Sequence, residues 1–183
     1  MSGLDVAEWA TILGTWVLVV GTLSFAYWQL RQAQRLHSAT TLLELREGFY
    51  SPRMKRARRA FSTWLLDSAR PEETGNWEVG VFFEQLGFLT RTGVLEKRMV
   101  WNAFGTWVAA YHSFLTQPEN LLDQWRKEGN DPLIFREFEW LAREMMSFES
   151  RLLSQSGGSP YNLEDARFVL EVESRLTAAD DSL

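Results

Sequence analysis

The chain has 183 residues, a formal net charge of −5 at pH 7 and no cysteine. The lack of cysteine excludes a disulfide framework, a thiolate nucleophile and a cysteine-ligated zinc site, and it agrees with a reducing compartment. Nine tryptophans and twelve phenylalanines supply bulky side chains for the core of one modest domain.

The first predicted element is a transmembrane helix over residues 9–30, because these 22 positions contain no charged side chain. At about 1.5 Å per residue, such a helix reaches about 33 Å and can cross a hydrocarbon core of ~30 Å. Trp9 at one end and Trp28 at the other are typical of membrane interfaces. Two alternatives stay open: a signal peptide, for which Ser24–Ala26 resembles a cleavage site, and a buried helix of a soluble core.

The charges beside this segment predict its orientation. No Lys or Arg precedes it, whereas Arg31, Arg35 and Arg46 follow it. The positive-inside rule therefore places residues 1–8 outside the cell and the long C-terminal part in the cytoplasm. We expect membrane lipid to be one partner of this protein.

Small and polar residues recur along one side of the expected span, namely Gly14, Thr15, Gly21, Thr22 and Gln29. Such a stripe favours close contact between helices, so we expect a homo-oligomer. One interpretation is a packing seam between spans. The other is a ring of spans whose stripe lines an aqueous lumen.

A juxtamembrane helix is expected over residues 31–50, and Ser51–Pro52 then resembles an N-cap followed by proline at the first helical position. On the helix that follows, an apolar arc faces a basic side made of Arg53, Lys55, Arg56, Arg58 and Arg59. This side can be a solvated surface, or it can contact anionic lipid headgroups, nucleic acid or the acidic face of a neighbouring copy.

The rest of the chain has helical periodicity and no convincing alternation of period two. Helices are expected over residues 77–92, closed by Gly93, and over 95–115, 120–128, 131–154 and 162–176. The fold class is therefore all-α: one N-terminal transmembrane helix that continues into a cytosolic bundle of about five or six helices. The bundle is expected over residues 51–178, with a tail at 179–183.

The sequence contains no phosphate loop, Rossmann glycine fingerprint or nucleophile elbow, and its two histidines lie far apart. We therefore expect no cofactor, no metal and no enzyme activity. The catalytic candidates are Arg31 and His37, a histidine for proton transfer and an arginine for a charged phosphate. On a straight helix these residues lie about 120° apart, which argues against a shared site.

Three stretches, Leu42–Tyr50, Phe82–Leu95 and Phe135–Leu141, resemble a widespread bacterial family of uncharacterised proteins with one N-terminal span and a helical cytosolic domain. The layout and the Arg31/His37 spacing also resemble the HEPN-like membrane accessory protein of type VI CRISPR systems. That resemblance implies a pore that strengthens antiviral defence.

These observations predict an oligomeric single-span protein of the bacterial inner membrane that acts as an effector in phage defence and can form a pore. The first alternative is a membrane-tethered helical adaptor that binds a cytosolic protein. The second is an RNase of the HEPN type, which would bring RNA as a partner.

Overall fold

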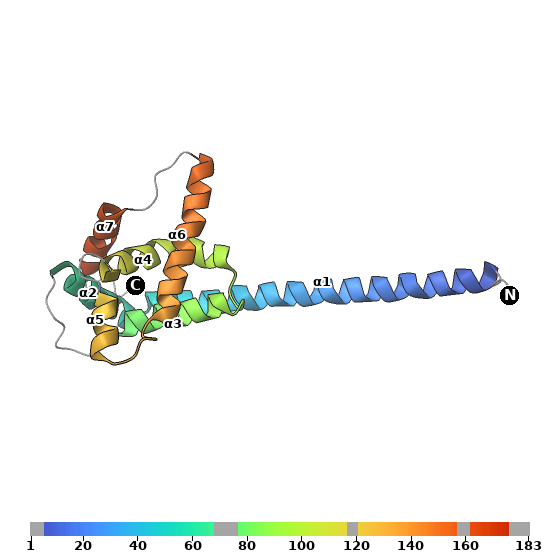
Figure 1. Ribbon diagram of the computed structural model, residues 1–183, viewed down its shortest axis with the longest axis horizontal. Coiled ribbons are helices and arrows are strands. Elements are labelled where there is room, and N and C mark those ends of the chain that lie inside the picture. The colour runs from blue at the N-terminus through green and yellow to red at the C-terminus, as the bar shows by residue number, and fades with distance from the viewer. Residues whose placement is uncertain (1–5, 68–76, 117–120, 157–161, 176–183) are drawn as a thin grey trace. The chain divides into compact units, whose positions relative to one another are not determined.

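The computed structural model describes residues 6–67, 77–116, 121–156 and 162–175. These residues form helices and no strand, which confirms the all-α prediction for this part of the chain (Figure 1). The helices are α1 (Val6–Tyr50), α2 (Pro52–Asp67), α3 (Trp77–Arg91), α4 (Lys97–Thr116), α5 (Leu121–Glu128), α6 (Arg136–Ser156) and α7 (Leu163–Ser174). The chain divides into two units, Met1–Thr40 and Thr41–Leu183.

The first unit consists of most of α1, a continuous helix of 45 residues that contains both the expected span and the juxtamembrane segment. From Trp16 to Leu30 its large apolar side chains are 43–73% exposed. The side chains of residues 6–14, including the first part of the expected span, lie outside the described ones. Among the residues that are described, no helix is long and apolar enough to cross a membrane.

The second unit is a bundle that begins at Thr41 and not at Ser51, the expected boundary. Phe49, in the last turn of α1, is fully buried. Its ring lies 5.0–6.0 Å, centroid to centroid, from four aromatic rings of α3 and α4, those of Phe82, Phe83, Phe104 and Trp107. The end of α1 is therefore part of the core.

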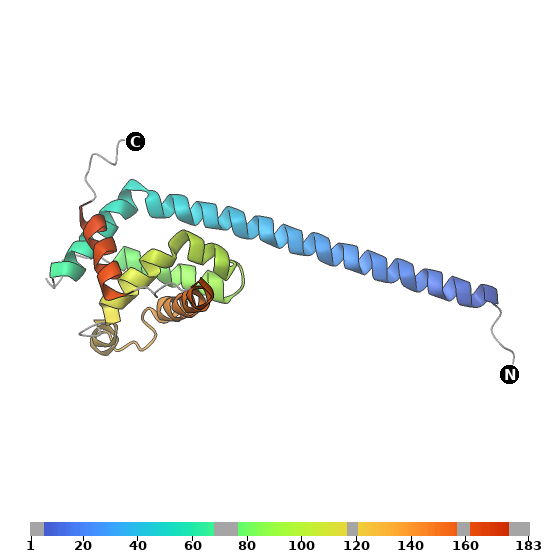
Figure 2. The ribbon, with the colours of Figure 1, turned by 90° about the horizontal axis from the view of Figure 1, so that it is seen from above.

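Two helices, α6 and α7, each pack against two others in the bundle. Figure 1 shows α6 crossing α3 and α4, and Figure 2 shows α7 alongside α2 and α4. Glycine allows α3 and α6 to approach closely, because a Cβ at Gly87 would overlap the backbone carbonyl of Glu137. The six helices α2–α7 agree with the expected number.

The start of α6 differs from the prediction. The sequence placed it at Asp131–Pro132, but the helix begins at Arg136. Phe135 has a φ of +53°, a left-handed conformation that bulky residues rarely adopt. Its ring is buried against α3 in the space left by Gly80. Packing of this ring therefore offsets the backbone strain and delays the helix.

Replacement of Gly87 by alanine tests the contact between α3 and α6. The added Cβ meets backbone rather than a flexible side chain, so we expect the free energy of unfolding to fall by about 1–3 kcal/mol. Gly48→Ala is the matched control, because no atom lies within 4 Å of the added Cβ. Denaturant titration of both variants measures the difference, and equal effects would contradict the close approach.

Candidate functional site

A buried pair of charges lies where α2, α4 and α7 meet. The side chains of Arg58 on α2 and Glu173 on α7 are 2% and 8% exposed. Nη1 of Arg58 donates a hydrogen bond to Oε1 of Glu173 at 3.2 Å, and Nε1 of Trp107 on α4 donates to the same oxygen at 2.8 Å. One carboxylate oxygen thus joins three helices.

Aromatic rings surround the guanidinium of Arg58. Its Cζ atom lies 4.1 Å from the ring centroid of Phe49 and 5.5 Å from that of Tyr50. A guanidinium is weakly hydrated and attracted to aromatic faces, which makes arginine the cation best suited to such a place. Nε of Arg58 and Oε2 of Glu173 are buried and have no hydrogen-bond partner among the described atoms.

A second polar contact lies beside the ion pair. The hydroxyls of Ser62 and Tyr111 are 3.1 Å apart and hydrogen-bonded. Burial, and then the negative charge of Glu173, raises the pKa of Tyr111 far above its usual range. The phenol therefore stays protonated at physiological pH. The contacts of Arg58, Trp107 and Glu173 hold α7 to the bundle, and we call these three residues the clamp.

The prediction that Arg58 lies on the basic side of α2 with Arg53, Lys55, Arg56 and Arg59 is wrong, because its side chain is buried. Arg58 precedes Phe61 by three residues and Leu65 by seven, so all three share one face of the helix, and this face is buried. Glu173 occupies an equivalent position on α7, because it follows the buried Ala166 by seven residues and the buried Leu170 by three. A charge within an apolar helical stripe could have revealed both residues.

The other four basic residues of α2 are exposed or half-buried. Arg56 and Arg59 are exposed, and Lys55 is half-buried. Nη2 of Arg53 forms an ion pair with Oε1 of Glu78 on α3 at 2.8 Å, and this hydrogen bond raises the pKa of Arg53 and lowers that of Glu78. The structure thus retains a basic surface on α2 but without Arg58.

Arg31 and His37 are not brought into a common site. Both lie on the continuous helix α1 with exposed side chains, and a separation of six residues turns them about 120° apart. Among the residues that the structure describes, no group of three or more His, Cys, Asp or Glu could hold a metal ion.

The polar stripe of α1 is described in part, because Gly14 lies outside the described side chains. Thr15, Gly21, Thr22 and Gln29 are exposed, and a Cβ at Gly21 would meet no atom within 4 Å. The hydroxyl of Thr22 donates to the carbonyl of Leu18 at 2.8 Å. This hydroxyl proton therefore has an acceptor within its own helix.

A shallow pocket of about 170 Å³ lies between α4 and α6. Trp101, Gly105 and Thr106 line it from α4, and Met145, Met146 and Glu149 line it from α6. Its volume suits a few water molecules rather than an organic substrate.

Removal of one partner of the Arg58–Glu173 ion pair tests whether this pair holds α7 to the bundle. Arg58→Ala leaves a buried carboxylate without its cation, so we expect the free energy of unfolding to fall by about 3–5 kcal/mol. Arg59→Ala, at the exposed neighbouring position, should change it by less than about 0.5 kcal/mol. The double variant Arg58→Met with Glu173→Leu removes both charges and should recover most of the loss. Denaturant titration measures all three, and a stable Arg58→Ala protein would argue against the clamp.

His112 on α4 provides a pH-dependent test of the core. It is 8% exposed, and burial lowers the pKa of its imidazole, with the opposing charges of Glu139 and Arg143 nearby. Because the folded pKa lies below the unfolded value of about 6.5, the histidine contributes stability above that pH and loses it as the pH falls toward the folded value. His112→Gln should flatten the dependence of unfolding free energy on pH below the unfolded value of about 6.5. A parallel curve for parent and His112→Gln would refute this origin of acid sensitivity.

Comparison with known proteins identifies the family. A family model described as a domain of unknown function, DUF4760, matches residues 9–145, from the start of the expected span to the middle of α6. No curated protein and no solved structure matches the chain. This result agrees with the resemblance to an uncharacterised family and shows no link to HEPN proteins or CRISPR systems. The chain therefore belongs to the DUF4760 family.

Proposed function

We propose that this protein is anchored in the bacterial inner membrane by residues 9–30, and that it acts through association of copies and not through catalysis. The observation that carries the proposal is the uncovered apolar surface of α1. Trp16, Val17, Leu18, Val19 and Val20 are consecutive, and each is at least 43% exposed. Five consecutive residues cover more than one helical turn of 3.6 residues, so every side of this segment is apolar.

A helix on the surface of a soluble domain has one apolar stripe and one polar face. Apolar surface on all sides has no favourable contact with water, and its removal from water contributes about 25 cal/mol per Å². Lipid can cover all sides of such a helix at once. The charges agree with this reading, because the first basic residue, Arg31, follows the apolar run directly.

The family match adds support of a different kind. The match to the family model begins at residue 9, where the charge-free run begins, and ends at residue 145, within α6 of the bundle. The apolar segment and the bundle are therefore parts of one family architecture. This arrangement favours an anchor that belongs to the function over a leader unrelated to the domain.

Self-association is supported by the open surface at Gly21. An exposed glycine lets the backbone of another helix approach closely, and Gly14 and Gly21 are separated by seven residues, the interval of a helix–helix seam. Because Thr22 is satisfied within its own helix, the seam explains the stripe without an aqueous lumen. We therefore favour a tethered assembly over a pore.

Charge insertion tests the anchor. Parent protein should resist extraction with alkaline carbonate, and a C-terminal reporter should be active in the cytoplasm. The double variant Leu18→Arg with Val20→Arg should release the protein, because each arginine near the centre of a span opposes insertion by about 2.5–3.5 kcal/mol.

The matched control is Leu36→Arg with Leu43→Arg. These leucines are 66% and 59% exposed on the same helix, but they lie beyond the expected span. This variant should remain in the membrane fraction. Extraction of the parent protein by carbonate would contradict the proposal.

A further inference from the structure

We propose that α7 forms a twofold contact with α7 of a second copy, the two helices running antiparallel. The inference rests on the self-association proposed above and adds the surface that the cytosolic bundle contributes to it. This surface lies outside the residues that the family model matches, which end at residue 145. It consists of Glu164, Phe168, Val172 and Arg175, which we call the outer face of α7.

The outer face is opposite the side that packs on the bundle. Ala166, Leu170 and Glu173 are buried against α2 and α4. Phe168 and Val172, by contrast, are 67% and 48% exposed. They are four residues apart and therefore adjacent on the helix, about half a turn away from the buried side. The described part of the chain leaves this apolar pair uncovered.

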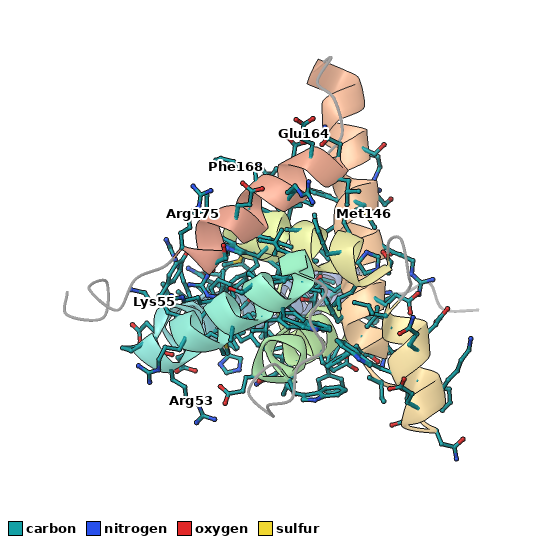
Figure 3. The ribbon with its side chains drawn as sticks, turned by 90° about the vertical axis from the view of Figure 1, so that its left-hand side faces the viewer. Arg53, Lys55, Met146, Glu164, Phe168 and Arg175 are labelled. Atoms are coloured by element: carbon teal, nitrogen blue, oxygen red, sulfur yellow. The ribbon has the colours of Figure 1, made fainter. Side chains whose placement is uncertain are left out.

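Charges flank the apolar pair with opposite signs. Glu164 lies four residues before Phe168, and Arg175 lies three residues after Val172. Figure 3 shows Glu164, Phe168 and Arg175 in this order along α7, directed away from the bundle. The side chain of Arg175 is 80% exposed, and its ion pair with Glu171 of the same helix is long, at 3.9 Å.

When a second α7 runs in the opposite direction, the acidic end of each helix faces the basic end of the other, and the apolar residues face each other. In an antiparallel pair, Phe168 meets Val172 of the second copy, and Glu164 meets Arg175 of the second copy at each end. A twofold contact requires such self-complementarity. A parallel pair would instead place like charges together, which is unfavourable.

The structure holds the outer face in a defined place. A capping box fixes the start of α7, with the side chain of Asn162 accepting from the backbone N–H of Asp165 at 2.9 Å and the carboxylate of Asp165 accepting from the N–H of Asn162 at 3.1 Å. Near the other end, the Arg58–Glu173 pair holds α7 to the bundle. The face is therefore presented by a rigid element.

A contact between two short helices is small, and by itself it would be weak in solution. Copies tethered in one membrane have a high effective concentration, so a weak contact suffices there. A twofold contact also closes at two copies, which predicts pairs of bundles rather than a ring built through this surface.

Disulfide trapping in native membranes tests the contact, since the chain has no cysteine of its own. Two differently tagged copies of the full chain carry Phe168→Cys and Val172→Cys, and we expect a mixed disulfide between them. Glu164→Arg or Arg175→Glu should lower its yield by about tenfold, because two pairs per dimer change from attraction to repulsion. Both substitutions together should restore it. Arg98→Glu, at an exposed position on α4, is the control of equal charge change and should leave the yield unaltered.

Two further measurements separate this inference from the proposed anchor. Carbonate extraction of the same samples reports the anchor alone, and Gly21→Leu reports the seam in α1 alone through the size of the solubilised particle. A missing mixed disulfide in copies that remain in the membrane would overturn the α7 contact and leave the anchor in place. So would charge reversals without effect, or a Phe168→Cys disulfide that forms only with a different protein.

Discussion

The carboxylate of Glu173 determines how the bundle closes. It joins the last described helix to α2 and α4 through Arg58 and Trp107, which precede Glu173 by 115 and 66 residues. Removing two charges from water is unfavourable, and their attraction offsets this only when the geometry is good. Such a pair therefore contributes less to net stability than to the choice of one arrangement. Here it selects the rotation of α7, and that rotation directs Phe168 and Val172 outward.

The bundle and the N-terminal half of α1 differ in how far their apolar side chains are buried. Around Phe49 the bundle covers its own aromatic surface, with rings from α3 and α4 and the guanidinium of Arg58 from α2. From Trp16 to Leu30 the large apolar side chains are exposed, and no other described residue covers them. Burial of the rings around Phe49 stabilises the bundle. We propose that lipid covers the exposed apolar side chains of α1, and that a second copy covers those of α7.

Much of the helical framework follows from sequence alone, because local signals determine it. Pro52 begins α2, and Gly93, with a φ of +79°, follows the end of α3; both positions are recognisable from the neighbouring sequence. The start of α6 could not be predicted in this way. It depends on the ring of Phe135 entering the space at Gly80, a contact between residues more than fifty positions apart.

The site was harder to predict than the fold. Basic residues crowd α2 so densely that Arg58 resembles its neighbours, and only its register with Phe61 and Leu65 distinguishes it. Its partner Glu173 lies in a different helix, which no local pattern connects to α2. The sequence also does not show the hydrogen bond of Thr22, whose hydroxyl donates to the carbonyl of Leu18 in the same helix.

The central claim is that lipid surrounds the apolar part of α1. The most direct measurement uses the cysteine-free chain with single cysteine substitutions at successive positions from residue 16 to residue 30. Each cysteine carries a nitroxide label in protein reconstituted into bilayers, and the label reports whether its position faces lipid or water. We expect collisions with oxygen to exceed collisions with a water-soluble nickel chelate on every side of the helix except at Gly21, with the greatest excess near Val19 and Val20. A periodic pattern in which one full side of the helix collides mainly with the nickel chelate would contradict it.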